Sequence, residues 1–339
     1  MLHTIPHPGE QPIDSSPDVE VLHAALTWLN AGDPVFLVTV AGTWGSSPRQ
    51  PGALMAIHPD GRFCGSVSGG CVEDDLVQRV MRGEFDTGLP KIEEYGVRPE
   101  QSQRVGLPCG GRLTLVIEQI DTPVQLQTVA DTLRARQQIS RRVCLTTGET
   151  SLHPVQPASE FSFDGDTLEK VFGPSWRLLL IGAGELTRRV AQLGLSLDYA
   201  VTICDSRPEY AEGWQVEGTA FINHPPAETV DILKPDPRTA VLALSHTPAL
   251  DDAGLAAALG SDAYYVGALG SQQNQRARCK RLEKRGVTPQ QLARLHGPVG
   301  LAIGSRTPAE IAVAIMAALI QERGQQHNRL SQSLNTANA

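Results

Sequence analysis

The 339-residue sequence predicts an α/β protein of two domains, the second of which is built on a parallel, doubly wound sheet. The length exceeds what one ordinary core fills and suits two domains of about 150 residues each. After residue 176, strand-like apolar runs alternate with helical patterns, which is typical of a parallel sheet covered by helices. The run IGAGELT follows one of these strands and opens a helix, so the second domain is expected to be Rossmann-like.

The N-terminal α/β domain is predicted over residues 18–150, after a disordered leader over residues 1–17. Apolar residues at helical spacing predict a helix over 19–30, and the apolar run VFLVTVAG predicts a buried strand over 35–42. Two strands flanking a Pro59-Asp60-Gly61 turn are expected next. The remaining elements expected in this domain are helices over 71–83 and 123–136 and strands over 112–120 and 141–147.

Residues 151–175 are predicted to be a hairpin or linker between the domains, because they are rich in Gly, Ser, Pro and acidic residues without a sustained period. The Rossmann-like domain follows over residues 176–324. Its strands are expected over 177–184, 200–205, 219–223, 239–246 and 263–271.

The last helix has a clear start signal in the sequence. Thr307 is a natural N-cap, Pro308 fits the first helical position and Glu310 completes a capping box. The helix is expected to end at Gly324, followed by a flexible tail over 325–339.

Charge and cysteine content exclude several classes of protein. The net charge is −8 and the sequence pI is about 5.6, so no basic surface for nucleic acid or an anionic membrane is expected. The six cysteines are dispersed without a CxxC pair, which argues against a zinc knuckle or a disulfide framework. Neither a signal peptide nor an apolar run of 18 residues is apparent, and we expect a reduced, cytoplasmic protein.

The IGAGELT segment carries most of a dinucleotide-binding fingerprint. Gly182 suits the tight turn, and Gly184 would let backbone amides approach a phosphate at the helix start. Asp205 ends the next strand, where a carboxylate usually accepts the ribose hydroxyls. Thr187 departs from the Gly or Ala of the third position, and Asp205 could instead cap Arg207 or the loop, so nucleotide binding stays open.

Two further loops follow strands of the second domain, where a ligand crevice is expected. His246, between Ser245 and Thr247, could donate a hydrogen bond to a phosphate or a pterin oxygen, or it could be a loop histidine without a task. Gly270 belongs to the glycine-rich loop GALGS after the next strand.

Three loops of the first domain combine glycines with groups that bind anions. In the first, the hydroxyls of Ser46 and Ser47 accompany Arg49, whose guanidinium suits bidentate contact with phosphate or carboxylate. In the second, Ser68, Gly69 and Gly70 are expected to expose successive N–H groups as an anion nest.

Two cysteines stand beside paired glycines in the second and third loops. Cys71 is expected near a helix start, where the helix dipole favours thiolate, and Cys109 precedes Gly110 and Gly111. They are either accessible thiols near an anion site or inert residues in tight packing. The other four are interpreted as structural: Cys64, Cys144, Cys204 and Cys279.

Taken together, these motifs resemble the XdhC/CoxI family of maturation factors. The first half carries GSSPRQPGALM, GSVSGGCVED, YG and GLPCGG, and the second half carries LLLIGAGELT, VTICDSRPEY, LSHTPALDD, YYVGALGSQQNQRARCKRL and RLHGPVGLAIGSRTPAEIAVAI. The motifs occur in the family's order over roughly residues 20–322. Departures at Thr187 and in LSHTPALDD put the Rossmann ligand in doubt.

The resemblance implies a cytoplasmic chaperone, without turnover of its own, that binds and protects molybdenum cofactor, as molybdopterin or its cytosine dinucleotide. It implies assistance in sulfuration of the cofactor and in its insertion into a xanthine dehydrogenase or aldehyde oxidoreductase. The implied partners are the apo-molybdoenzyme, a cysteine desulfurase and a second copy of the chain in a homodimer. No catalytic residue is assigned, no metal site is expected, and Cys71 or Cys109 is a candidate contact to molybdenum.

Two other functions are kept open. An NAD(P)-dependent oxidoreductase would use Gly182, Gly184 and Asp205, with His296 and Glu73 as the best candidates for proton transfer, although each is more easily explained as structural. A pure interaction module would present the apolar helix over 307–322 to a partner.

Overall fold

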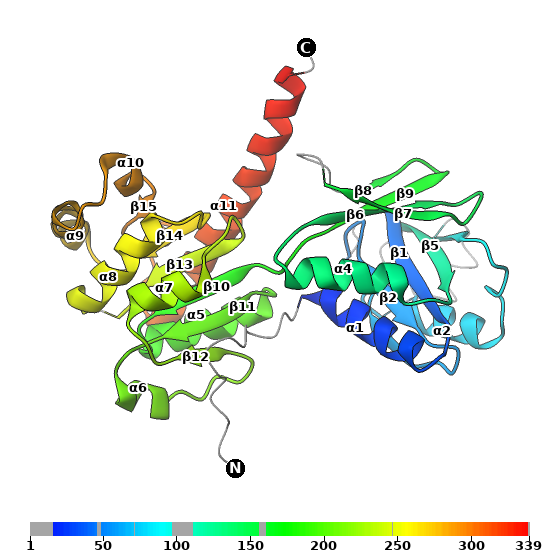
Figure 1. The fold of residues 1–339 in the computed structure, drawn as a ribbon, viewed down its shortest axis with the longest axis horizontal. Helices are drawn as coiled ribbons and strands as arrows, with labels where there is room; N and C mark the ends of the chain where they lie inside the picture. Colours follow the sequence, from blue (N-terminus) through cyan, green and yellow to red (C-terminus); the bar gives the residue numbers. More distant parts are fainter. Residues whose placement is uncertain are drawn as a thin grey trace. The chain divides into compact units, whose positions relative to one another are not determined.

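The computed structural model describes residues 16–45, 49–70, 72–96, 111–155, 161–245 and 247–337, with side chains to residue 325. The described chain divides into two compact units, residues 16–174 and residues 175–337. The division falls at the C-terminal end of the segment predicted to be a hairpin or linker, and each unit has its own sheets and core (Figure 1).

The N-terminal unit is built on an antiparallel five-stranded sheet in the order β3-β2-β1-β5-β4. Helix α2 (Glu73–Met81) packs its apolar residues against one face, and α1 (Pro17–Asn30) and α4 (Val124–Arg134) cover the other. Ser16 caps α1, so ordered helix begins inside the segment predicted as a leader. The strands are β1 (Val35–Trp44), β2 (Leu54–Ile57), β3 (Phe63–Gly65), β4 (Lys91–Tyr95) and β5 (Arg112–Ile120).

A second antiparallel sheet completes this unit, and within residues 151–175 two of its strands, β8 and β9, pair as a hairpin, which is one of the two expectations for this segment. Its strands are ordered β7-β6-β9-β8. A buried ion pair joins the two sheets, because Arg141 of β6 donates to both carboxylate oxygens of Glu118 of β5 at 3.0 and 2.8 Å. The strands are β6 (Ile139–Cys144), β7 (Thr150–Pro154), β8 (Phe161–Phe163) and β9 (Thr167–Phe172).

The C-terminal unit confirms the predicted Rossmann-like sheet. Its six strands are all parallel, in the order β12-β11-β10-β13-β14-β15. This is the doubly wound arrangement, in which the order of strand addition reverses between β10 and β13. The strands are β10 (Arg177–Ile181), β11 (Ala200–Cys204), β12 (Ala220–Ile222), β13 (Thr239–Ala243), β14 (Tyr265–Ala268) and β15 (Leu295–His296).

Helices cover both faces of this sheet. Apolar residues of α5 and α11 share one core with the sheet, and those of α7, α8 and α9 share the other. The helices are α5 (Glu185–Ser196), α6 (Pro208–Glu212), α7 (Pro226–Leu233), α8 (Pro248–Leu259), α9 (Gln272–Lys284), α10 (Pro289–Leu292) and α11 (Pro308–Ala337).

Helix α11 starts as predicted and continues past its predicted end. Thr307 Oγ1 accepts the Glu310 N–H at 3.3 Å, and Glu310 Oε2 accepts the Thr307 N–H at 3.0 Å, which is the expected capping box. The segment predicted as a flexible tail after Gly324 is helical to Ala337, because one interior glycine weakens a helix by only about 1 kcal/mol. No helix in the described chain is both long and apolar enough to cross a bilayer.

Candidate functional site

The loops after β10 and β13 meet where the strand order of the Rossmann-like sheet reverses. Gly182 has a φ of +94°, and a Cβ atom there would lie 2.5 Å from the Cα atom of Ser245. Only glycine fits so close an approach in that conformation. Gly184 differs, since a Cβ atom there would meet nothing within 4 Å and no side chain caps α5. The start of α5 therefore offers open space for an anion.

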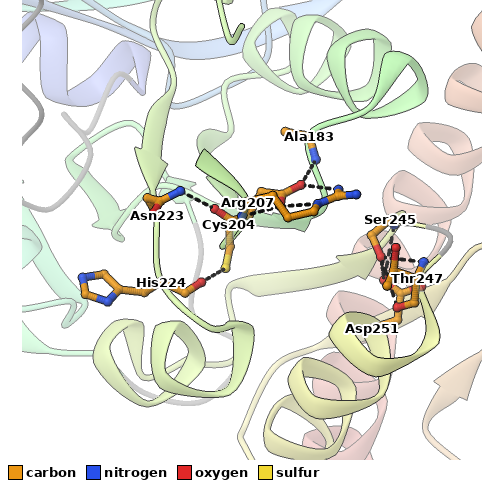
Figure 2. A network of polar contacts seen from close by, with 9 residues as sticks. Ala183, Cys204, Arg207, Asn223, His224, Ser245, Thr247 and Asp251 are labelled. Carbon is orange, nitrogen blue, oxygen red and sulfur yellow. Dashed lines mark hydrogen bonds and ion pairs between the residues drawn. The ribbon is translucent and has the colours of Figure 1, made fainter. Parts of the chain in front are cut away.

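Asp205 lies at the end of β11, and its carboxylate bridges the glycine loop and Arg207 (Figure 2). Its Oδ2 accepts the Ala183 N–H at 2.9 Å and a bond from Arg207 Nη2 at 2.6 Å. Its Oδ1 accepts the Arg207 N–H at 3.1 Å and a bond from Arg207 Nε at 2.8 Å. The carboxylate is fully buried, so both oxygens are engaged within the chain.

Electrostatics keep Asp205 ionised in this network. Burial alone would raise the pKa of the carboxyl, but the hydrogen bonds from Arg207 and Ala183 outweigh it and lower the pKa below its usual range. The guanidinium of Arg207 also lies over the Tyr210 ring, 3.7 Å from its centroid. Asp205 therefore fixes the glycine loop and Arg207, which is the capping interpretation left open by the sequence.

The third position of the fingerprint is Thr187 instead of a glycine, and the close packing of α5 on the sheet occurs at another glycine. Thr187 is fully buried, and its Oγ1 has no hydrogen-bond partner among the described residues. The close contact between α5 and the sheet occurs instead at Gly194, where a Cβ atom would lie 3.0 Å from Leu178 and 3.1 Å from Val201. Helix α5 therefore approaches the sheet closely through a different glycine.

The loop after β13 is tied down by a buried carboxylate of α8. Asp251 Oδ1 accepts from the Ser245 hydroxyl at 2.6 Å, and that hydroxyl accepts the Thr247 N–H at 3.0 Å (Figure 2). Burial raises the pKa of Asp251, and the bonds from Ser245 oppose that rise.

Gly270, after β14, has a φ of +147°, and the carbonyl of its chain neighbour Leu269 accepts a hydrogen bond from the buried Arg278 at 2.8 Å.

In the N-terminal unit, the chain's own carboxylate fills the predicted anion nest. Glu73 Oε1 accepts the N–H groups of Val67 and Ser68, both at 2.9 Å. Its Oε2 accepts the N–H groups of Gly70 at 3.0 Å and Val72 at 3.1 Å. The hydroxyls of Ser66, at 2.7 Å, and of Ser68 complete this set.

Glu73 is therefore a structural carboxylate, the explanation that the sequence favoured, and it occupies the nest that was predicted for a ligand. Burial disfavours its charge, but the hydrogen bonds from Ser68 and Ser66 prevail and lower its pKa to about 2. A carboxylate that stays ionised is no proton donor near neutral pH, so Glu73 does not suit proton transfer. The amides of Ser68 and Gly70 are engaged by it, and Gly69 donates to the Ser66 hydroxyl at 3.1 Å, so the nest is not left open for a ligand.

Described residues of the glycine-rich loops of this unit contact one another. Arg49 Nε donates to the Ser66 hydroxyl at 3.3 Å, which joins the first loop to the second. A Cβ atom on Gly45 would lie 3.3 Å from the Cα atom of Gly111, and one on Gly96 would collide with the Gly111 carbonyl. Gly45 and Gly96 therefore both approach the backbone of Gly111 closely.

Several predicted site residues fall outside the described residues, and their predictions stand untested. The described ones are Arg49, Ser68, Gly69, Gly70, Gly111, Gly182, Gly184, Asp205 and Gly270. Within the described chain, no group of three or more His, Cys, Asp or Glu residues is arranged to hold a metal ion. The predicted residues outside the described ranges are Ser46, Ser47, Cys71, Cys109, Gly110 and His246.

The described cysteines are all unpaired thiols, in different environments. Cys204 is buried, its Sγ donates to Thr229 Oγ1 at 3.1 Å, and burial raises its pKa to about 11, as suits a structural residue. Cys144 is half-buried, and bonds from the hydroxyls of Thr146 and Thr147 lower its pKa to about 7. The dispersed pattern of cysteines gave no signal for that difference.

Comparison with known proteins relates both units to one family. Residues 178–319 match the XdhC Rossmann domain, and residues 28–96 match the XdhC and CoxI family. The chain is 27% identical over 317 residues to the molybdenum cofactor insertion chaperone PaoD of Escherichia coli, covering 94% of this chain and 92% of that protein.

Two further relatives extend this likeness. A probable xanthine dehydrogenase subunit of Bacillus subtilis is 26% identical over 313 residues, covering 85% of this chain and 92% of that protein. A crystal structure described as a xanthine dehydrogenase of Bacillus halodurans has a TM-score of 0.71 at 25% identity, covering 90% of this chain and 96% of that one.

Glu73 predicts an acid-sensitive N-terminal unit. Its folded pKa of about 2 lies below the ordinary value of 4.5, so its contribution is complete above pH 4.5 and is lost as pH falls toward 2. We expect Glu73→Gln to lower the free energy of unfolding at pH 7 by about 3 kcal/mol and to flatten this acid slope. Denaturant unfolding across this pH range measures both, with the exposed Glu94→Gln as control. An unchanged slope would contradict the structural assignment.

The Asp205 network predicts that the stability of the C-terminal unit depends on this carboxylate. Asp205→Asn removes the charge that Arg207 and Ala183 share, and we expect the free energy of unfolding to fall by about 2–3 kcal/mol. Denaturant unfolding measures the change, with Glu209→Gln on α6 as the control. A loss below about 0.5 kcal/mol would show that this network does not hold the glycine loop.

Proposed function

Because the chain belongs to the XdhC and CoxI family, we propose that it binds molybdenum cofactor and delivers it to a xanthine dehydrogenase-type molybdoenzyme. The observation that carries this proposal is the likeness to the insertion chaperone PaoD along nearly the whole length of both chains. Sequence likeness in both units favours a shared task more strongly than a Rossmann-like domain alone would.

The geometry supports a carrier of an anionic, nucleotide-like cargo. Open space at Gly184 lies before the uncapped start of α5, where N–H groups and the helix dipole favour a phosphate. Arg207 is held at the neighbouring strand end by Asp205, with its side chain 29% exposed. The cofactor carries a phosphate on its pterin, and its dinucleotide form adds a nucleotide, so an open helix start next to an arginine suits its charge.

The described residues favour a chaperone over an enzyme. Glu73 is ionised inside its nest, and His296 stacks on Tyr265 with ring centroids 4.1 Å apart. Burial lowers the pKa of His296, so the imidazole stays neutral at physiological pH. Neither candidate for proton transfer is therefore arranged as an acid or base toward an open site.

The carboxylate that would bind the ribose of NAD(P) is engaged within the chain. A dinucleotide of that type places its ribose hydroxyls on the carboxylate after the second strand. Here that carboxylate, Asp205, is buried and already accepts bonds from Ala183 and Arg207. Ribose binding there would have to break an internal ion pair.

The finer parts of the proposal follow from the family. The cargo is molybdopterin or its cytosine dinucleotide, sulfurated with the help of a cysteine desulfurase before insertion. The protein acts as a homodimer in the cytoplasm, where its thiols stay reduced.

Cofactor retention tests the proposed function. The purified protein is mixed anaerobically with molybdopterin cofactor, its cytosine dinucleotide form or NAD, and pterin and molybdenum are measured after gel filtration. We expect stoichiometric retention of one pterin form and none of NAD, and a preference between the pterin forms identifies the cargo. Retention of NAD alone would contradict the proposal.

A charge placed at Gly184 tests the phosphate site. Asp fits the open space and is a good N-cap, so Gly184→Asp should fold while repelling an anion. We expect the Kd for the cofactor to rise about tenfold or more, whereas the neutral Gly184→Asn changes it less than about threefold. Equal Kd values for the two variants would place the phosphate elsewhere.

A further inference from the structure

The N-terminal unit contains a cavity between its two sheets, where β5 ends and α4 begins. The volume of this cavity is about 180 Å³, and its walls come from the loop before β4, the end of β5, the start of α4, β6 and the start of β7. An engineered core cavity of about 150 Å³ holds benzene, and one water needs only about 10–15 Å³. The cavity is therefore large enough for a small ring.

The buried ion pair that joins the sheets forms part of the wall. Arg141 and Glu118 both line the cavity, and their side chains are 5% and 3% exposed. Nη1 and Nη2 of Arg141 donate to the two carboxylate oxygens of Glu118, so each charge neutralises the other. The Nε of Arg141 has no hydrogen-bond partner among the described residues. The wall therefore carries a spare donor without a spare positive charge.

A second lining side chain carries a spare acceptor. Gln125, in the first turn of α4, donates through Nε2 to the Thr150 carbonyl at 2.8 Å. That bond sets the orientation of the amide, because the reversed amide would place one oxygen against another. Gln125 Oε1 is buried and has no partner in the described part of the chain. Buried polar atoms without partners are destabilising, so a molecule that pairs with both of these atoms would bind favourably.

The chemistry of the cavity favours a neutral ring with a lactam edge. The spare donor and the spare acceptor call for an acceptor and a donor on one molecule, as the C=O and N–H of a lactam provide. An anion would meet the carboxylates of Glu118 and Asp121, whereas an ammonium ion has no acceptor for Arg141. Leu89 and Leu126 add apolar wall for the faces of a ring.

We propose that this cavity binds a small neutral lactam of pyrimidine size, whose carbonyl accepts from Arg141 Nε and whose N–H donates to Gln125 Oε1. The site lies within the N-terminal unit and does not depend on the proposed delivery of a cofactor. Because the ligand contacts β5, α4 and β6 together, its binding stabilises the packing of the second sheet on the first.

Ligand-observed NMR titration of the full chain tests the ligand class, with uracil as the probe. We expect uracil to bind with a Kd of about 1 mM or lower. Dimethyluracil, methylated at both ring nitrogens, has no donor and should bind at least about tenfold more weakly. Benzoate, a planar anion, should bind no better than dimethyluracil. Equal Kd values for uracil and dimethyluracil, or no saturable binding of uracil at about 20 mM, would overturn the proposal.

Uridine distinguishes the two sources of this lactam edge. It keeps one ring N–H between two carbonyls but carries a ribose. An affinity equal to that of uracil would identify a nucleoside as the ligand, and a weaker affinity would identify a free base. Either result supports a lactam site.

Substitution of Gln125 tests the location of binding. Gln125→Leu removes the acceptor, and we expect it to raise the Kd for uracil about tenfold. The matched control is Gln127→Leu, the same change on α4 at a residue outside the cavity wall, which should leave the Kd within about twofold. Thermal unfolding of each variant without ligand checks that it is folded. An unchanged Kd in Gln125→Leu would place uracil elsewhere and overturn the site.

The donor is tested by replacing the whole ion pair. A single change at Arg141 would leave Glu118 buried without its partner and could unfold the unit, whereas a pair of apolar side chains of similar volume is tolerated. The double variant Glu118→Met with Arg141→Met should therefore fold and bind uracil about tenfold more weakly. Uracil binding as tight as in the wild-type protein would contradict the assigned donor. None of these results bears on cofactor retention, so the proposed function is tested separately.

Discussion

The carboxylate of Glu73 is the group around which the glycine-rich loop before α2 is built. A buried charge is tolerated only when hydrogen bonds replace its lost water, and here four backbone amides and two serine hydroxyls do so; the amides are those of Val67, Ser68, Gly70 and Val72. The loop gains a fixed shape from this arrangement. Arg49 also donates to Ser66, so Glu73 is linked to the first loop through that hydroxyl.

In the Rossmann-like unit, buried carboxylates also hold the loops after β10 and β13. Asp205 gathers the Ala183 amide and the Arg207 guanidinium, and Asp251 holds the loop after β13 through Ser245. These carboxylates act as internal ligands of loops that resemble ligand-binding loops. Preformed loops reduce the ordering entropy lost on binding, which suits the proposed role as a carrier.

Much of this organisation could be predicted from the sequence. The alternation of strands and helices predicts the parallel sheet, and the Gly182–Gly184 spacing predicts the tight turn that contacts Ser245. The nest was predicted from its glycines, but its occupant was not, because a pattern of residues does not tell whether an amide cluster faces a ligand or the chain's own carboxylate. A strand near 141–147 and a hairpin or linker after it were predicted, but their pairing into a second sheet was not, because strands such as Phe161–Phe163 are too short to show a period.

The central claim is that both loops are held by internal carboxylates before any cargo binds. Hydrogen–deuterium exchange on the ligand-free protein tests it most directly, at the amides of Ser68, Gly70 and Ala183. The account predicts slow exchange at all three, lost at Ser68 and Gly70 in Glu73→Gln and at Ala183 in Asp205→Asn. Exchange in the wild-type protein as fast as in an open loop would contradict it.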